Sequence, residues 1–182
     1  MSLARTRIAV RLLAVAALAA LTAGCFQPMY AEHADGTGLR DKLLTVDIPP
    51  IDKPNASQEA RLGVEIRNAL AFKLYGNATG APPLYKLIIR FSSSRSSLIV
   101  DPNTGLPTSE NYGIDAQFNL VEIATDKSVM TGTTFSHVSY DIPGSYQRFA
   151  RARAIRDAED RSAQEIAEHI QTRLASYFFT GS

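Results

Sequence analysis

Apolar residues recur with two different periods along the chain, and each period predicts one kind of secondary structure. In one segment they recur at every fourth position, at Leu62, Ile66, Leu70 and Leu74. This spacing places them on one face of a helix, so we predict a helix over residues 57–75. Asn55 or Ser57 can cap its start, and Gly76-Asn77 is a typical helix stop.

Alternation of apolar and polar residues predicts three strands after this helix. Apolar residues occupy every second position in two segments, first at Tyr85, Leu87, Ile89 and Phe91, and then at Tyr112, Ile114, Ala116, Phe118 and Leu120. The first strand can continue through a serine-rich stretch to Val100, and residues 101–105 have the composition of a turn. A hairpin turn over 124–128 then leads into a strand over 129–140 that is rich in Thr and Ser.

The chain ends in a long predicted helix, from just after Pro143-Gly144 to near Phe178. Its apolar stripe keeps a spacing of three and four residues, at Ile155, Ala158, Ala163, Ile166, Ala167, Ile170, Leu174 and Tyr177. The opposite face is charged, with pairs such as Asp157 and Arg161 four positions apart. We therefore expect the apolar stripe to be buried and the charged face to be solvated.

The order of these elements predicts the fold class. A short apolar run, Leu43, Leu44, Val46 and Ile48, predicts one more strand before the first helix, which Pro49-Pro50 ends because proline has no N–H group for a sheet. One-sided strands and helices in the order β-α-β-β-β-α call for a two-layer α+β sandwich. We predict an approximately four-stranded mixed sheet with two helices packed on one face, in which the first strand is parallel to a neighbour.

The first thirty residues have the order of a bacterial lipoprotein signal. Arg5, Arg7 and Arg11 precede an apolar run over residues 12–21, and small residues lead into the single cysteine, Cys25. We predict a signal peptide over residues 1–24, a lipid attached to Cys25, a tether over 25–41 and one domain over 42–179. An ordinary signal peptide with an incidental cysteine is the alternative.

Charge and motifs exclude several classes of function. Removing three arginines with the signal leaves 16 Lys and Arg against 18 Asp and Glu, so the mature chain has a net charge of −2. This charge provides no global basic field for nucleic acid. His33, His137 and His169 have no metal-ligand spacing, and we find no nucleophile or phosphate-loop motif. We expect no enzyme, cofactor or metal, and membrane attachment only through the N-terminal lipid.

The start of the mature chain carries a family resemblance. Cys25-Phe26-Gln27-Pro28-Met29-Tyr30 resembles the C-G-F-x-P-L-Y start of the LPS-assembly lipoprotein family LptE, although it lacks the Gly after Cys25 and has Met29 in place of Leu. The predicted order of elements also resembles that family over essentially the whole mature chain, from Arg67-Asn68-Ala69-Leu70 in the first helix to Ala167-Glu168-His169-Ile170 in the last. Phe26, where an Asp would signal retention at the inner membrane, resembles an outer-membrane destination.

The resemblance implies a lipid-anchored protein on the periplasmic side of the outer membrane. It would plug and assist the assembly of a β-barrel like LptD, contact lipopolysaccharide, and help its transport and insertion into the outer leaflet. The Ser- and Thr-rich segments 92–97 and 131–139 suit the polar lumen of such a barrel, or are ordinary solvated strand faces. The residues by themselves leave open an independent envelope lipoprotein that binds a small or peptidoglycan ligand in its own cavity.

Lipopolysaccharide would present phosphates, for which arginine is a natural bidentate donor. The first candidate group is Lys86, Arg90 and Arg95, which we expect at or near one polar edge of their strand. The second group precedes the last helix, at Arg148, Arg151, Arg153 and Arg156. For both groups, solvated surface charge is the alternative.

Overall fold

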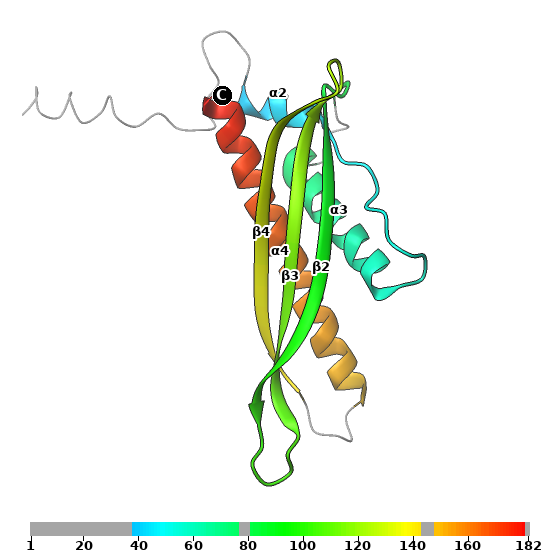
Figure 1. The fold of residues 1–182 in the computed structure, drawn as a ribbon, viewed down its shortest axis with the longest axis vertical. Coiled ribbons are helices and arrows are strands. Elements are labelled where there is room, and N and C mark those ends of the chain that lie inside the picture. The colour runs from blue at the N-terminus through cyan, green and yellow to red at the C-terminus, as the bar shows by residue number, and fades with distance from the viewer. Residues whose placement is uncertain (1–37, 77–80, 143–147, 181–182) are drawn as a thin grey trace, which may run out of the picture. The chain divides into compact units, whose positions relative to one another are not determined.

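A four-stranded sheet with helices against one of its faces makes up the described part of the chain (Figure 1). The structure is a computed structural model that describes residues 38–76, 81–142 and 148–180. In chain order the elements are α2 (Leu39–Leu44), β1 (Val46–Asp47), α3 (Gln58–Tyr75), β2 (Tyr85–Val100), β3 (Pro107–Glu122), β4 (Lys127–Asp141) and α4 (Arg148–Thr180). The predicted α+β class with a mixed sheet is confirmed.

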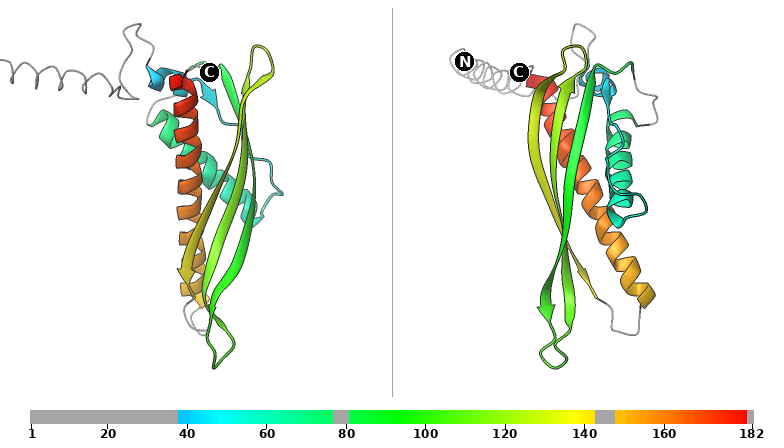
Figure 2. Two further views of the ribbon diagram at one scale, coloured as in Figure 1. Left: turned by 60° about the vertical axis from the view of Figure 1, so that its left-hand side comes forward. Right: turned by 45° about the vertical axis from the view of Figure 1, so that its right-hand side comes forward.

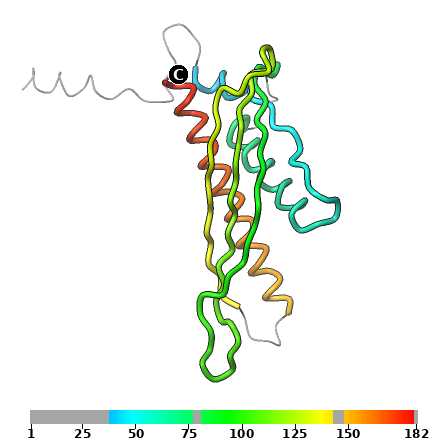
Figure 3. The backbone as a smooth tube through the Cα atoms, in the orientation of Figure 1, coloured from blue at the N-terminus to red at the C-terminus, as the bar shows by residue number. Residues whose placement is uncertain are grey.

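The strands lie side by side in chain order, so each pairs with the next. β1 pairs with β2 in parallel, whereas β2, β3 and β4 form a long antiparallel meander. The parallel pair arises because α3 carries the chain back before β2 begins, as predicted from the strand-helix-strand start. Figure 3 allows this path to be followed from the short N-terminal elements through the three long strands.

Alternate side chains of the strands face the helices and form the core. On β2 and β3 the buried apolar positions are Leu87, Ile89, Phe91, Tyr112, Ile114, Ala116, Phe118 and Leu120. α4 covers β3 and β4, and α3 packs against α4 beside β2 (Figure 2). The helices contribute the residues that the four-residue spacing predicted, including Leu62, Ile66, Leu70, Ile166, Ile170 and Leu174.

The ends of α3 follow the chemistry of its sequence. The Ser57 hydroxyl accepts a hydrogen bond from the Ala60 N–H at 2.9 Å, which satisfies one of the free donors of the first turn. Gly76 follows the last residue of α3 and has a φ of 61°, a backbone conformation that residues with a Cβ atom rarely adopt. The predicted cap and stop are both confirmed, and Ser57 rather than Asn55 is the cap.

The predicted strand over 43–48 is wrong in its first half. Leu43 and Leu44 belong to helix α2, and β1 contains only Val46 and Asp47. The spacing of four between Leu39 and Leu43 explains the difference, because it gives one short helical turn a buried face on which both leucines are at most 4% exposed. The predicted signal peptide and nearly all of the tether lie outside the described residues.

The β2–β3 hairpin is longer than the alternation indicated. β2 runs to Val100, as its serine-rich continuation allowed, and β3 begins at Pro107 rather than at Tyr112. The turn of the hairpin extends beyond the start of α4 in all views (Figures 1 and 2). The outer part of the hairpin consequently has less helix against it than the middle of the sheet.

Two residues of α3 that are two positions apart but differ in burial test the assignment of its buried face. Ile66 is 0% exposed and Val64 is 54% exposed. We expect Ile66→Asp to lower the free energy of unfolding by about 4 kcal/mol or more, because it places an unpaired charge in the core. Val64→Asp should change it by only about 0.5 kcal/mol. Urea unfolding followed by circular dichroism measures both, and equal losses would contradict the assignment.

Candidate functional site

The end of the molecule opposite α2 brings together three segments that are far apart in the sequence. We call it the distal end, and it consists of residues 95–112, 138–141 and the first turns of α4 (Figure 1). Arg151 of α4 lies 3.4 Å from Glu110 of β3, and Tyr140 of β4 donates a hydrogen bond to the same carboxylate. These contacts fix the start of α4 against the base of the β2–β3 hairpin.

The distal end exposes an unusual number of large apolar side chains. Leu98, Ile99, Val100 and Leu106 of the hairpin are each more than half exposed, and Phe149 in the first turn of α4 is 90% exposed. Exposed apolar residues that occur singly are ordinary, but a group of them marks a surface for a partner or a ligand. The distal end is therefore a candidate interaction site.

Arginines accompany this apolar surface. Arg148, Arg151 and Arg153 are exposed, and the structure places all of them within α4 instead of before it, because the helix begins at Arg148. Cations are unfavourable in the first turn of a helix, where the partial positive charge of the backbone N–H groups accumulates. Arg151 offsets this through its ion pair with Glu110.

Glu110 and Tyr140 form the buried polar part of the distal end. Glu110 is 9% exposed and Tyr140 is 6% exposed. Burial, together with the hydrogen bond to Glu110 and the charge of that carboxylate, raises the pKa of Tyr140 from 10.0 to about 12. Tyr140 therefore stays protonated as a donor throughout the physiological pH range.

The three basic residues predicted on β2 do not share a face. Lys86 and Arg90 are exposed on the face of the sheet opposite the helices, whereas Arg95 is on the helix side, directly across from buried Tyr112. The predicted common polar edge is thus wrong for Arg95. Side chains alternate between the two faces of a strand, so Arg95, at an odd-numbered position, lies on the same side as Leu87, Ile89 and Phe91.

Lys86 and Arg90 belong to what we call the open face, the side of β2, β3 and β4 that faces away from α4. Its side chains are mainly hydroxyl and amide groups, with Phe135 63% exposed among them. A depression of about 410 Å³ lies over the middle strands, lined on this face by Arg90, Ser92, Asp115, Gln117, Thr133 and Phe135. This surface is polar and slightly hollowed.

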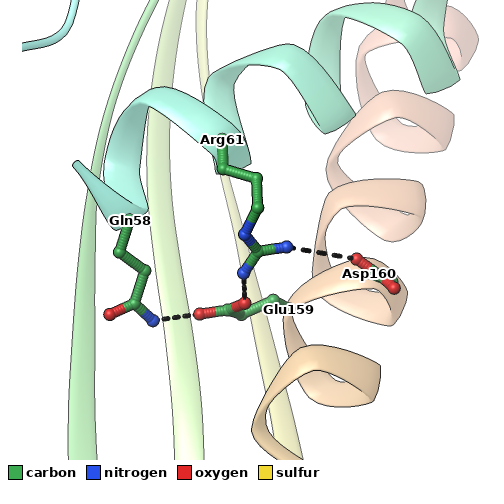
Figure 4. Close-up of polar contacts among 4 residues, drawn as sticks. All are labelled: Gln58, Arg61, Glu159 and Asp160. Atoms are coloured by element: carbon green, nitrogen blue, oxygen red, sulfur yellow. Dashed lines mark hydrogen bonds and ion pairs between the residues drawn. The ribbon is translucent and has the colours of Figure 1, made fainter. Parts of the chain in front are cut away.

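A second polar cluster joins α3 to α4 near the distal end. Glu159 of α4 is 0% exposed, and its carboxylate accepts hydrogen bonds from the side chains of Gln58 and Arg61 (Figure 4). Arg61 also lies 3.9 Å from Asp160, which is exposed. The adjacent carboxylates Glu159 and Asp160 thus contact one guanidinium from different environments, the first buried and the second exposed, and the spacing of charges along α4 did not predict the burial of Glu159.

The described residues provide no site for metal chemistry and no helical membrane span. No group of three His, Cys, Asp or Glu side chains within them is arranged to hold a metal ion. His169 is used in a contact with Thr134 at 2.9 Å between α4 and β4. None of the helices that the structure describes is long and apolar enough to cross a membrane.

Comparison with known families decides the assignment. Residues 43–174, from the end of α2 to near the end of α4, match the model of the family LptE, described as lipopolysaccharide-assembly. The chain belongs to the LptE family. The match confirms the family resemblance through residues 43–174, a part of the chain that does not include the Cys25 motif.

Solved structures support the LptE fold assignment. A lipoprotein from Caulobacter crescentus has 21% identity and a TM-score of 0.61, over 79% of this chain and 97% of the other. Rare lipoprotein B from Shewanella oneidensis has 17% identity and a TM-score of 0.51, over 74% of this chain and 96% of the other. At these identities the likeness concerns the fold. A search of curated proteins gave no match.

The raised pKa of Tyr140 predicts how stability depends on pH. Between pH 10 and pH 12 the unfolded state releases the tyrosine proton while the folded state keeps it, so the free energy of unfolding falls as pH rises through this window. Tyr140→Phe should remove that part of the decline. At neutral pH it should cost about 1–3 kcal/mol, because Glu110 loses its donor. Urea midpoints from about pH 8 to about pH 11.5 test this, and parallel curves for the two proteins would contradict it.

Proposed function

We propose that this LptE-family protein is an outer-membrane lipoprotein that sits within the lumen of a large β-barrel like LptD. In this role it plugs the barrel, assists its assembly and helps lipopolysaccharide to reach the outer leaflet. The observation that carries the proposal is the distal end, where exposed apolar side chains and arginines meet on one surface of a lipopolysaccharide-assembly family member. The proposed role is one of binding and positioning, with no catalytic step.

The distal end matches the chemistry of lipopolysaccharide. That molecule combines phosphates with acyl chains, which need bidentate cationic donors beside an apolar surface. Arg148 and Arg153 supply exposed guanidinium groups next to Phe149, and Leu98 and Ile99 supply apolar area on the hairpin. We propose phosphate contacts by Arg148, Arg151 and Arg153 in the first turns of α4 and by Arg95 on the helix side of β2, whereas Lys86 and Arg90 lie on the opposite face of the sheet.

The open face matches the wall of a barrel lumen. Such lumens are polar and wet, so a protein inside one needs hydrogen-bonding groups rather than an apolar surface. Ser92, Gln117 and Thr133 offer such groups across three neighbouring strands. Lys86 and Arg90 belong to this same polar surface, where they can pair with lumen acids. We propose that the open face is the side turned to the barrel wall.

Purification from the outer membrane tests the barrel partnership. In a mild detergent, the full-length protein should elute as a stoichiometric complex with a large outer-membrane barrel. Gln117→Arg with Thr133→Arg should abolish that complex, because two long cations are added to the open face. The matched control is Gln164→Arg with Thr172→Arg, which makes the same changes at exposed positions of α4. A native monomer would contradict the partnership, and equal behaviour of both variants would contradict the choice of face.

Lipid attachment is the second part of the proposed function that can be measured. Intact mass of the native protein should show acyl groups on Cys25, and Cys25→Ser should release the protein from the membrane because the anchor is lost. The thermal melt of the variant should match that of the native domain, since the core residues of the sheet and helices are unchanged. A native mass without lipid would contradict the anchor.

A further inference from the structure

A cleft of about 650 Å³ opens between the first turns of α3, the first turns of α4 and the outer half of β2. Its walls combine two kinds of side chain. Apolar surface comes from Val64 of α3 and Ile155 of α4, together with three alanines, and the charged residues are Arg61, Arg95, Arg156 and Glu159. Arg95 and Arg156 reach the cleft from different elements, one from the sheet and one from a helix.

The charges in the cleft do not balance. Glu159 is fully buried and already engaged by Arg61 and Gln58, so its negative charge is compensated within the protein (Figure 4). Within residues 38–76, 81–142 and 148–180, neither Arg95 nor Arg156 forms an ion pair with a carboxylate. Two guanidinium groups are therefore left to face the cleft, beside an apolar wall.

The first turn of α3 adds to this positive character. Ser57, Gln58 and Ala60 line the cleft, so the free N–H groups at the start of an 18-residue helix lie close to it. The Ser57 side chain satisfies only the N–H group of Ala60. The helix start thus favours an anion, in addition to the two arginines that carry the inference.

We propose that this cleft binds one phosphate of a phosphorylated amphiphile, held between Arg95 and Arg156, with the start of an apolar chain against Val64 and Ile155. The buried Glu159–Arg61 pair sets the spacing between α3 and α4 and so keeps the cleft open. This inference rests on the proposed function, because that function brings lipopolysaccharide to the protein. It assigns one phosphate to a site that includes Arg156 and is separate from the arginines of the first α4 turn.

The apolar wall favours an amphiphile over other anions. A free phosphate or an acidic peptide needs the arginines only, whereas a lipid also gains from contact with Val64, which is 54% exposed. Arginine forms two parallel hydrogen bonds to a phosphate, so removing two arginines removes the strongest contacts of the head group. The roles of charge and apolar wall can therefore be separated by different substitutions.

The test uses the full-length protein in a neutral detergent, with fluorescence-detected binding of three probes: lipopolysaccharide, the same lipopolysaccharide after enzymatic dephosphorylation, and inorganic phosphate. Arg95→Ala with Arg156→Ala should weaken lipopolysaccharide binding about tenfold or more. Val64→Gln removes apolar surface without changing the charge and should weaken lipopolysaccharide binding about threefold or more. The matched control, Arg40→Ser with Lys127→Ser, removes the same charge at exposed positions outside the cleft and should leave affinity within about twofold.

Each outcome has one meaning. Dephosphorylated lipopolysaccharide should bind the native protein as weakly as intact lipopolysaccharide binds the double variant. Inorganic phosphate should bind weakly to the native protein and to the double variant. Equal affinity of the cleft variant and the matched control for lipopolysaccharide overturns the cleft, and so does failure of the native protein to bind lipopolysaccharide. Inorganic phosphate that binds as tightly as lipopolysaccharide, with no effect of Val64→Gln on either probe, overturns the amphiphile. Co-purification of the cleft variant with the barrel shows whether the barrel partnership holds when the cleft proposal fails. Thermal melts confirm that each variant is folded.

Discussion

The rest of the structure depends on the burial of one face of a three-stranded meander. β2 and β3 present a continuous row of apolar side chains to one side, and such a face is stable in water only when it is covered. α4, with its 33 residues, covers β3 and β4, and α3, which packs against α4, completes the cover beside β2. Because the helices occupy one face, the opposite one keeps its hydroxyl and amide groups available to a partner.

The buried carboxylate of Glu159 adds specificity to this packing. A charge that is removed from water is tolerated only if its lone pairs are satisfied, and here Gln58 and Arg61 satisfy them from the neighbouring helix. Such a pair contributes little net stability, but it penalises any other register of α3 along α4. The same fixed register separates the two helices near their first turns, where the amphipathic cleft lies.

The division of the surface follows from this architecture and gives the proposed function its physical basis. The open face is polar and broad, which suits contact with a hydrated protein wall. The distal end combines apolar side chains with arginines, which suits an amphiphile that carries phosphates. The proposed function thus assigns different partners to two surfaces of one small domain, a barrel wall to the open face and a lipid to the distal end.

The sequence by itself determined the helices α3 and α4, the three long strands, their buried sides and the family resemblance, because side-chain period and capping residues are local properties. Two further features follow from local spacing as well: the odd position of Arg95 on β2 places it on the helix side, and the position of Glu159 within the apolar stripe of α4 indicates that it is buried. Only the tertiary structure decided that Leu39–Leu44 forms a helix, that Arg61 reaches Glu159 across 98 positions, and that Arg151 reaches Glu110 across 41. These features depend on contacts between distant segments, and no local pattern specifies which distant charge will become a partner once the sheet is covered.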